Sequence, residues 1–589
     1  MNATFPFDPA ISICSPAPLG TRFDIGGCYN RTLGCSFFPK VPIYQCTEYC
    51  GSAFGYYELS DVLETFITWV IPLFALLANM DVAESTLVTL SLDWPRASKI
   101  LNHCLPRWLR NFIKSLLPKH FVFSVQLANP IGTIWSLADK LDLGQRLWDH
   151  FNKEELYNAL HLGDAKRDGA RRDKVRRDIA NLCYCLDDFG YEKFEGRVNR
   201  LFDLLKMEGE ISRRVYKHVK KTSHSLALIR IRNTRRTTVA VLVYGGAVVT
   251  SVLASTTSNG LDYALPHTIA LRELCFFVLA QVILSSAAGG WPQQWTPQEI
   301  MRNFATQIRN IEAGLGKEGT QILWKDLGKE EITLWDGGSY VFRPQKKIYP
   351  SLVNVDRNKF SCENGSRWRL FLPCMAWFMV IFAFTVSFTM SFLTPTTGIG
   401  GRGLAEILYI TVWSVNFIGE YCMTQRIHDR IGYINHIHRR RLFMLIWLKD
   451  GIISLLVLLF FFLPFIGKPY SSAVIRSVTL LFANLRPGWY NSCKSWSAWF
   501  SRWNSAYLDL NIAKTESWLL FRVYLVGAIV GSVAQVLMAL FIIYIRGKAI
   551  GLSQRSNKEN RKELCRDVGG STVIKEQGEQ HDHSRPLLP

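Results

Sequence analysis

Two glutamates and an asparagine recur at helical spacing inside one apolar stretch of this 589-residue chain. Together with a tryptophan, they are separated by seven, three and four residues, which places them on one stripe of a helix. The members of the stripe are Glu406, Trp413, Asn416 and Glu420. An acidic side chain inside a membrane costs about 2.5 to 3.5 kcal/mol on insertion scales and normally faces a partner or water. The stripe could therefore line the path of a transported species.

Two charged residues at the start of the next apolar stretch can reach the cytoplasmic end of this stripe. They are Lys449 and Asp450. We expect Lys449 to hold Glu420, because antiparallel helices joined by a cytoplasmic turn bring these two ends together. An alternative interpretation is that Glu406 and Glu420 lie near opposite membrane interfaces and extend their carboxylates to water.

No catalytic signature accompanies the stripe. The sequence lacks the GxxxxGK[ST], HExxH and GxSxG motifs of nucleotide hydrolases, zinc proteases and serine hydrolases. Two GxGxxG matches, at 314–319 and 398–403, lack the flanking strand and helix that a dinucleotide site needs. His428, His436 and His438 alternate with arginines, whose charge opposes a bound cation. We therefore expect neither an enzyme nor a cofactor or metal site.

The stripe belongs to one of seven apolar stretches that we predict to span a membrane. The stretch 445–467 fixes their orientation, because Arg439, Arg440 and Arg441 precede it and basic residues favour the cytoplasmic side. The seven stretches are 61–79, 237–254, 268–289, 370–393, 403–424, 445–467 and 517–545. The fold class that follows is an all-α polytopic membrane protein with its N-terminus outside and its C-terminus inside.

The formal net charge of +20 agrees with this orientation, since cytoplasmic loops of multi-pass proteins are enriched in Lys and Arg. Residues 80–236 hold 29 Lys and Arg against 19 Asp and Glu. The basic run 166–177 is interrupted by Asp168 and Asp173 and has no aromatic residues, so we expect no nucleic-acid partner. The run 213–236 lies next to a predicted span, where each basic residue adds about 1 kcal/mol of attraction to anionic lipid of the inner leaflet.

Hydrophobic periodicity predicts a helical bundle within the cytoplasmic region 80–236. Two amphipathic helices are indicated by Val175, Ile179, Leu182, Leu186 and Phe189, and by Phe194, Val198, Leu201 and Leu205. The segment 120–141 is apolar but is broken by Asn129-Pro130 and Gly132, which favours an interfacial or re-entrant helix over a full span. A second cytoplasmic section, 290–369, is expected to begin with a helix at 297–313 and to hold a hairpin at 332–342. The polar tail 546–589 is expected to be disordered.

The outer regions are predicted to be a small disulfide-bonded domain, 1–60, and a Trp-rich loop, 468–516. The N-terminal domain holds five cysteines, and the loop adds a sixth; they are Cys14, Cys28, Cys35, Cys46, Cys50 and Cys493. An odd number would leave one thiol unpaired in an oxidising compartment, so we expect Cys493 to bond to one of the other five. Six cysteines allow 15 connectivities, and incomplete pairing or pairing across a dimer is the alternative.

Two further features of the outer N-terminal domain follow from its sequence. Asn2 and Asn30 lie in glycosylation sequons and are candidate modification sites. The start has neither a basic region nor an apolar core typical of a cleaved signal, so 61–79 is expected to act as an uncleaved anchor.

Close helix packing is predicted in the seventh span, where Gly527 and Gly531 form a GxxxG pattern. Three other segments carry a resemblance: Asn129-Pro-Ile-Gly-Thr-Ile-Trp-Ser-Leu137, and Leu253-Ala-Ser-Thr-Thr257 paired with Pro266-His-Thr-Ile-Ala270 and Leu284-Ser-Ser-Ala-Ala-Gly-Gly290. The sequence there resembles a group of uncharacterised multi-pass membrane proteins of filamentous fungi. That resemblance implies a multi-pass fold and assigns no activity or site residues.

The function we expect is that of a non-enzymatic sensor or adaptor in the plasma membrane or a secretory-pathway membrane. It would link the outer domain to the basic cytoplasmic region, with the lipid bilayer and a cytoplasmic protein or a second copy of the chain as partners. The alternative is a transporter or channel that uses the polar stripe. These hypotheses are distinguished by whether the stripe lines a cavity or lies against protein and lipid.

Overall fold

The computed structural model describes the parts of the 589-residue chain in which its helices and strands lie. These are residues 40–42, 71–78, 80, 126–151, 169–188, 195–207, 210–230, 234–257, 272–291, 295–314, 365–393, 401–430, 445, 448–457, 507–509 and 524–546. The elements, in chain order, are β1 (Lys40–Pro42), α3 (Ile71–Leu77), α7 (Pro130–Phe151), α9 (Gly169–Asp188), α10 (Glu195–Lys206), α11 (Glu210–Ile229), α12 (Thr234–Thr257), α14 (Phe277–Ala288), α15 (Trp295–Ala313), α16 (Gly365–Leu393), α17 (Gly401–Arg430), β2 (Tyr507–Asp509) and α22 (Leu525–Arg546).

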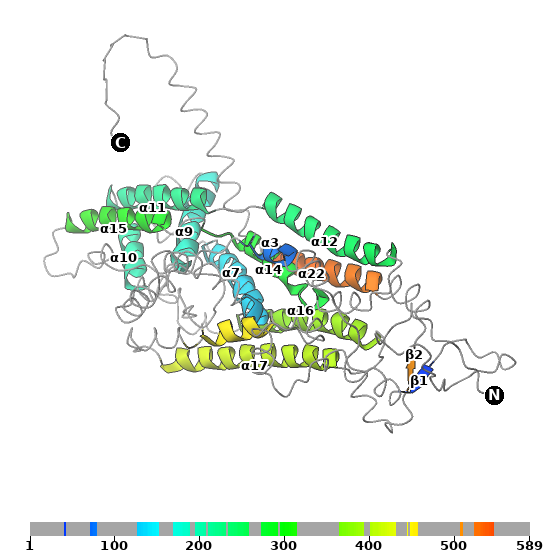
Figure 1. The fold of residues 1–589 in the computed structure, drawn as a ribbon. Coiled ribbons are helices and arrows are strands. Elements are labelled where there is room, and N and C mark those ends of the chain that lie inside the picture. The colour runs from blue at the N-terminus through cyan, green and yellow to red at the C-terminus, as the bar shows by residue number, and fades with distance from the viewer. Residues whose placement is uncertain are drawn as a thin grey trace, which may run out of the picture.

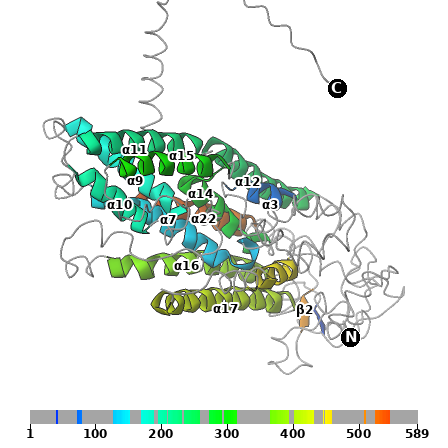
Figure 2. The same ribbon diagram turned by 90° about the vertical axis from the view of Figure 1, so that its left-hand side faces the viewer.

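The helices form two groups with separate hydrophobic cores, joined by α7 (Figure 1). The first group, which we call the apolar bundle, consists of α3, α7, α12, α14, α16, α17, α22 and the helical residues 448–457. The second, which we call the polar bundle, consists of α9, α10, α11, α15 and the C-terminal part of α7. The polar bundle lies at the opposite end of the molecule from β1 and β2 in both views (Figures 1 and 2).

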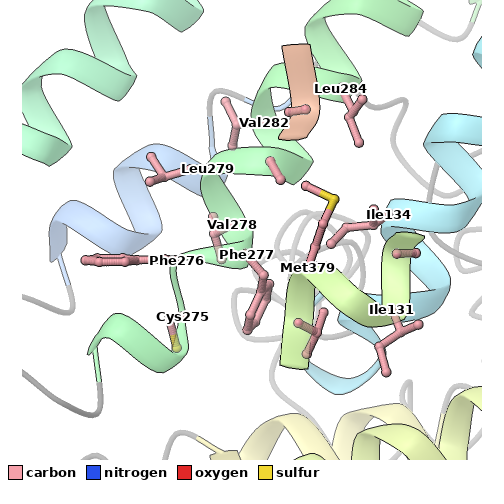
Figure 3. Close-up of a cluster of buried hydrophobic side chains, with 14 of the residues drawn as sticks. Ile131, Ile134, Cys275, Phe276, Phe277, Val278, Leu279, Val282, Leu284 and Met379 are labelled. Atoms are coloured by element: carbon pink, nitrogen blue, oxygen red, sulfur yellow. The ribbon is translucent and has the colours of Figure 1, made fainter. Parts of the chain in front are cut away.

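Helix α14 occupies the centre of the apolar bundle. Every residue of this helix except Ile283 is buried, because α7, α12, α16, α22 and α3 surround it. Figure 3 shows Phe277 and Val282 of α14 among Ile131 and Ile134 of α7 and Met379 of α16. Such burial explains why nine of the twelve α14 residues are apolar and why they are not confined to one face.

Two helices of the apolar bundle are long and apolar enough to cross a membrane, over Phe371–Phe392 in α16 and Leu525–Arg546 in α22. Large apolar side chains of these helices point outward. On α22 they are Val526, Ile529, Val530, Val533, Leu537, Leu540 and Phe541. Exposed apolar surface of this extent is typical of a face that meets lipid or another protein.

The polar bundle buries one apolar face of each amphipathic helix. Val215, Val219 and Leu226 of α11 are buried, while its basic residues lie outside. Helix α11 packs against α9, α10 and α15, so the two sections that we expected to be cytoplasmic, 80–236 and 290–369, contribute to a single bundle.

The described elements bear out the helical pattern and refine its boundaries. The stretches 237–254, 370–393 and 403–424 lie within α12, α16 and α17, and the helix expected at 297–313 is α15. The periodic residues Val175, Ile179, Leu182 and Leu186 of α9 are buried together, as are Leu201 and Leu205 of α10. Only parts of 61–79, 445–467 and 517–545 are described, as α3, residues 445 and 448–457, and α22. The hairpin at 332–342 and the tail after Arg546 lie outside the described residues.

The stretch 268–289 is not one continuous helix where it is described. A turn at Cys275 and Phe276 separates the helical residues 272–274 from α14. Backbone N–H groups of Cys275 and Phe276 donate to the carbonyls of Arg272 and Glu273, three residues earlier. This tighter hydrogen-bond pattern interrupts the α-helix and directs Arg272 and Glu273 into the interior.

The interfacial or re-entrant placement expected for 120–141 stays a prediction. In the described part of this segment, residues 126–138 are buried without exception, so no face of it is open there. The break at Asn129-Pro130 is present, but it lies inside the protein.

A short antiparallel pair joins two segments that are distant in sequence, with Lys40 opposite Asp509 and Pro42 opposite Tyr507. It connects the N-terminal region to the section between residues 457 and 524. The six cysteines expected to form disulfides and the sequons at Asn2 and Asn30 lie outside the described residues, so the Cys493 disulfide stays a prediction. Four of the described cysteines, Cys183, Cys275, Cys374 and Cys422, carry free thiols.

Candidate functional site

The first turn of α7 is set by three signals in the sequence. The side-chain oxygen Oδ1 of Asn129 accepts a hydrogen bond from the Gly132 backbone N–H at 2.9 Å, which makes Asn129 the N-cap. Pro130 follows at the first helical position, where its missing N–H is not needed. A Cβ on Gly132 would lie 2.5 Å from Asn129 Nδ2, so the close approach of this cap requires glycine.

This arrangement frees the backbone carbonyls of the preceding residues. Pro130 has no N–H to donate to the Gln126 carbonyl. The Gly132 N–H donates to the Asn129 side chain instead of to the Ala128 carbonyl. Side chains from other helices replace these donors. Gln281 Nε2 donates to the Gln126 carbonyl at 3.3 Å, Trp413 Nε1 to that of Leu127 at 3.0 Å, and Asn416 Nδ2 to that of Ala128 at 3.1 Å.

A charged cluster lies directly beside the cap. Asn129 Nδ2 donates to Glu420 Oε2 at 2.5 Å, and Lys449 Nζ lies 2.7 Å from Glu420 Oε1. Lys449 Nζ is also 3.2 Å from Asp450 Oδ1 and donates to Asn416 Oδ1. We call these five residues, Asn129, Asn416, Glu420, Lys449 and Asp450, the cap cluster.

Burial differs between the acids and the base of the cap cluster. Asp450 is 1% exposed and Glu420 7%, whereas the Lys449 side chain is 36% exposed. Two carboxylates are therefore held inside the protein by one ammonium group that reaches its surface. Carboxylate and amide oxygens thus surround the Lys449 ammonium group, in the way that oxygen ligands surround a bound cation.

The expected pairing of Glu420 with Lys449 is confirmed, and Asp450 and Asn416 join it. Glu406 does not, although it lies on the same helix. Its Oε1 accepts hydrogen bonds from Ser387 and Ser391 of α16, at 3.0 and 2.5 Å. Glu406 is 0% exposed, so the alternative in which it extends to water is wrong.

Aromatic side chains separate the two polar regions of α17. Trp413 is fully buried and stacks on Tyr409, with ring centroids 5.7 Å apart. The Trp413 ring also packs edge-on against Phe277 of α14. The stripe therefore lies against protein along this length.

Sequence reasoning missed the partners that other helices supply to the site. Gln281 and Asn129 lie on apolar segments and carry no pattern of their own, and Glu273 was hidden in a stretch interpreted as one span. The Asn129-Pro130 pair was recognised as a helix break, and its N-cap chemistry was the signal that could have located the site.

Gly527 and Gly531 allow α22 to approach its neighbours closely. A Cβ on Gly531 would lie 3.0 Å from the Phe276 ring, and one on Gly527 would overlap the end of the Met390 side chain. Beyond them, Gln535 Nε2 donates to the Met379 carbonyl at 2.7 Å. The GxxxG pattern thus packs α22 against α14 and α16, as small residues at helix interfaces do.

A second polar contact region joins α7 to the polar bundle, and we call it the joint. Two cations lie close to the Tyr184 ring: Lys140 Nζ is 4.2 Å from its centroid, and the Arg230 guanidinium is at 4.3 Å. Lys140 donates to the Tyr184 carbonyl at 2.9 Å, and the Tyr184 hydroxyl donates to the Ala288 carbonyl at 3.1 Å. Arg230 also donates to the Gly289 carbonyl, so α7, α9, α11 and α14 meet here.

Among the described residues, no group of three or more His, Cys, Asp or Glu side chains could hold a metal ion. The chain matches no family model, no curated protein and no solved structure.

Proposed function

We propose that this chain is a multi-pass membrane protein, a non-enzymatic sensor or adaptor that links outer segments to the polar bundle on the cytoplasmic side. The outward-facing apolar side chains of α22 support a lipid-facing position for the apolar bundle. The basic residues exposed on α11 support a cytoplasmic position for the polar bundle. The plasma membrane or a secretory-pathway membrane would suit disulfide-bonded, glycosylated outer segments.

The observation that carries this proposal is the course of α7. Its first turn is fixed by the cap cluster, and Ile131 and Leu141 belong to the core of the apolar bundle. Leu143 and Leu147 of the same helix belong to the core of the polar bundle. A change in the cap cluster would therefore move a rigid helix whose other end lies inside the polar bundle.

Contacts along α7 would transmit such a movement. Lys140 is held at the joint, and Asp142 Oδ1 lies 3.2 Å from Arg546 Nε at the end of α22. Lys140 and Asp142 are both buried. Displacement of α7 would therefore break the contact of Lys140 with α9 and that of Asp142 with α22 together. Because breaking a buried pair costs about 3 to 5 kcal/mol, the two bundles are expected to move as a coupled system.

The exposed face of α11 is the part of the polar bundle best suited to a partner. Five basic residues lie along it: Arg213, Arg214, Lys217, Lys220 and Lys221. Helix α11 extends from the start of α12 away from the apolar bundle (Figures 1 and 2). Within α11, Lys221 lies eight residues, about 12 Å of helix, before Ile229, and this distance exceeds the screening length of about 8 Å at physiological salt. This face suits an acidic protein segment, while Arg235 and Arg236 remain near enough for anionic lipid.

The experiment is hydrogen–deuterium exchange of the full chain in lipid nanodiscs. Glu420→Gln weakens the cap cluster, and Thr411→Val alters an exposed side chain of the same helix as a control. We expect Glu420→Gln to increase exchange in α9 and α10, and the control to leave it unchanged. Increased exchange confined to α17 and the first turn of α7 would contradict coupling.

A transporter is the second candidate, because one observation favours it. The cap cluster lies at a break in the chain where α7 begins, and discontinuous helices form the substrate and ion sites of many membrane transporters. The buried Trp413 argues against an open path next to it. Cation or proton flux into proteoliposomes, abolished by Glu420→Gln and retained in Thr411→Val, would favour transport over the sensor.

A further inference from the structure

Two exposed cysteines lie on neighbouring helices of the apolar bundle. Cys374 belongs to α16 and Cys422 to α17, and both carry free thiols on the surface of the protein. The other described cysteines, Cys183, Cys185 and Cys275, are buried. Among the residues that the structure describes, the thiols of α16 and α17 are therefore the ones open to a reagent from outside.

Helices α16 and α17 lie side by side and run antiparallel (Figures 1 and 2). Trp377 Nε1 of α16 donates to Ser414 Oγ of α17 at 3.2 Å. Ser387, ten residues later on α16, donates to Glu406, eight residues earlier on α17. The N-terminal end of α16 therefore lies beside the C-terminal end of α17.

Both thiols lie toward this shared end of the helix pair. Cys374 lies three residues before Trp377, and Cys422 lies eight residues after Ser414. The difference of five residues corresponds to about 7.5 Å along a helix. The two thiols therefore occupy similar levels of the apolar bundle, on two different helices.

In the topology proposed above, this end of the helix pair lies at the cytoplasmic boundary. The apolar part of α16 begins at Phe371, three residues before Cys374. The span predicted for α17 ends at residue 424, two residues after Cys422. Four arginines lie just beyond the two cysteines: Arg367, Arg369, Arg426 and Arg430. Because basic residues favour the cytoplasmic side of a span, both thiols are placed where the membrane meets the cytoplasm.

An apolar surface continues from each thiol along its helix. On α16, Trp377 and Phe378 are exposed one turn away from Cys374. On α17, Ile418 is exposed one turn away from Cys422. Residues three or four positions apart share one face of a helix, so each thiol belongs to an outward-facing apolar stripe. An alkyl chain attached to either sulfur would lie along these side chains.

We propose that Cys374 and Cys422 are S-acylation sites that take long-chain fatty acyl groups. Each sulfur attacks the carbonyl carbon of a long-chain acyl thioester, so that a new thioester bond forms at Sγ and the bond to the carrier sulfur breaks. The thiol proton passes to the carrier, which leaves as a thiol. Cysteines at the membrane boundary are typical sites of this reversible modification. The inference rests on the membrane orientation in the function proposed above, to which it adds a covalently attached lipid.

The test is hydroxylamine-dependent exchange of thioesters for a maleimide mass tag, on the full chain from membranes of a eukaryotic host. Free thiols are blocked first, so each acylated cysteine adds one tag. We expect Cys374→Ser and Cys422→Ser each to remove one tag, and the double variant to remove two. The matched control Cys275→Ser changes a buried thiol and should remove none.

Peptide mass spectrometry of the wild type keeps the proposal testable if a serine variant fails to fold, and it should find an acyl group on both cysteines. Tags that the double variant retains in full, or a wild type without acyl groups on Cys374 and Cys422, would overturn the assignment.

The sequon at Asn364 separates this failure from a wrong membrane orientation, because it lies ten residues before Cys374. Missing acyl groups together with glycan on Asn364 would refute both the orientation and the acylation. Missing acyl groups without that glycan would refute the acylation alone.

Discussion

Asn416 illustrates how one side chain serves two purposes in the cap cluster. Its amide N–H₂ donates to the Ala128 carbonyl, and its carbonyl oxygen accepts from Lys449. The same residue therefore satisfies the backbone at the helix break and holds the cation of the cluster. An aspartate here would lose the donor, and a leucine would lose both contacts.

Removing one member of the Glu420–Lys449 pair should be costly, because Glu420 is buried. Loss of one partner from a largely buried pair costs about 3 to 5 kcal/mol, against up to about 1 for an exposed pair. We expect Glu420→Gln to lower the thermal stability of the detergent-extracted chain and Lys449→Met to restore part of it. Lys217→Met on the exposed face of α11 is the control and should have no effect. Additive losses in the double variant would show that the two residues do not interact.

Asp178 on α9 should make the polar bundle less stable as pH rises. Burial raises the pKa of its carboxyl to about 6, although the Tyr216 hydroxyl donates to it at 3.0 Å. The folded chain therefore binds this proton more tightly than the unfolded chain, whose aspartate pKa is near 3.9, so stability falls between about pH 4 and pH 6. Asp178→Asn keeps an acceptor for Tyr216 and should raise stability at pH 8 by up to about 3 kcal/mol.

Thermal unfolding at pH 5 and pH 8, followed by circular dichroism of the chain in nanodiscs, measures this effect. Asp203→Asn on the exposed face of α10 provides a matched control and should unfold like the wild type. A loss of stability for Asp178→Asn at pH 8 would contradict the prediction.

At the scale of elements, periodicity predicted the helices whose partners are generic apolar surfaces. The buried positions of α9 and the courses of α12, α16 and α17 follow from spacing and apolar length alone. The role of α7 did not follow, because the donors that satisfy its freed carbonyls come from residues 281, 413 and 416. Local sequence shows that hydrogen bonds are missing at such a break, but it does not show which distant side chains replace them.

The contact between α22 and α14 should depend on Gly531. A valine there would press against Phe276, and overpacking of this kind costs about 1 to 3 kcal/mol. We expect Gly531→Val to lower the melting temperature of the chain in nanodiscs. Gly246→Val on α12, where a Cβ meets no atom within 4 Å, is the control. If Phe276→Leu in addition restores stability, the loss comes from this contact; equal losses for both glycine variants would refute it.

For the whole molecule, the packing of α15 on α11 places the start of the section 290–369 in the polar bundle. That section holds a sequon at Asn364, which should remain unmodified if the polar bundle is cytoplasmic, while Asn30 outside should carry glycan. Glycopeptide mass spectrometry of the chain from a eukaryotic host measures both sites. Glycan on Asn364 would overturn the topology, and Asn30→Gln provides the control for site assignment.

The break before α7 also determines when the protein can finish folding during synthesis. Asn129 binds Glu420, which lies 291 residues later in the chain. At roughly 5 to 20 residues per second, the ribosome makes the two residues about 15 to 60 s apart. Until α17 has been synthesised, the carbonyls of Leu127 and Ala128 lack the α17 side chains that donate hydrogen bonds to them in the folded protein. Water is then the remaining hydrogen-bond donor for these carbonyls. The segment 126–133 would thus remain at the boundary between membrane and water, and it would enter the apolar bundle only after α17 has been inserted.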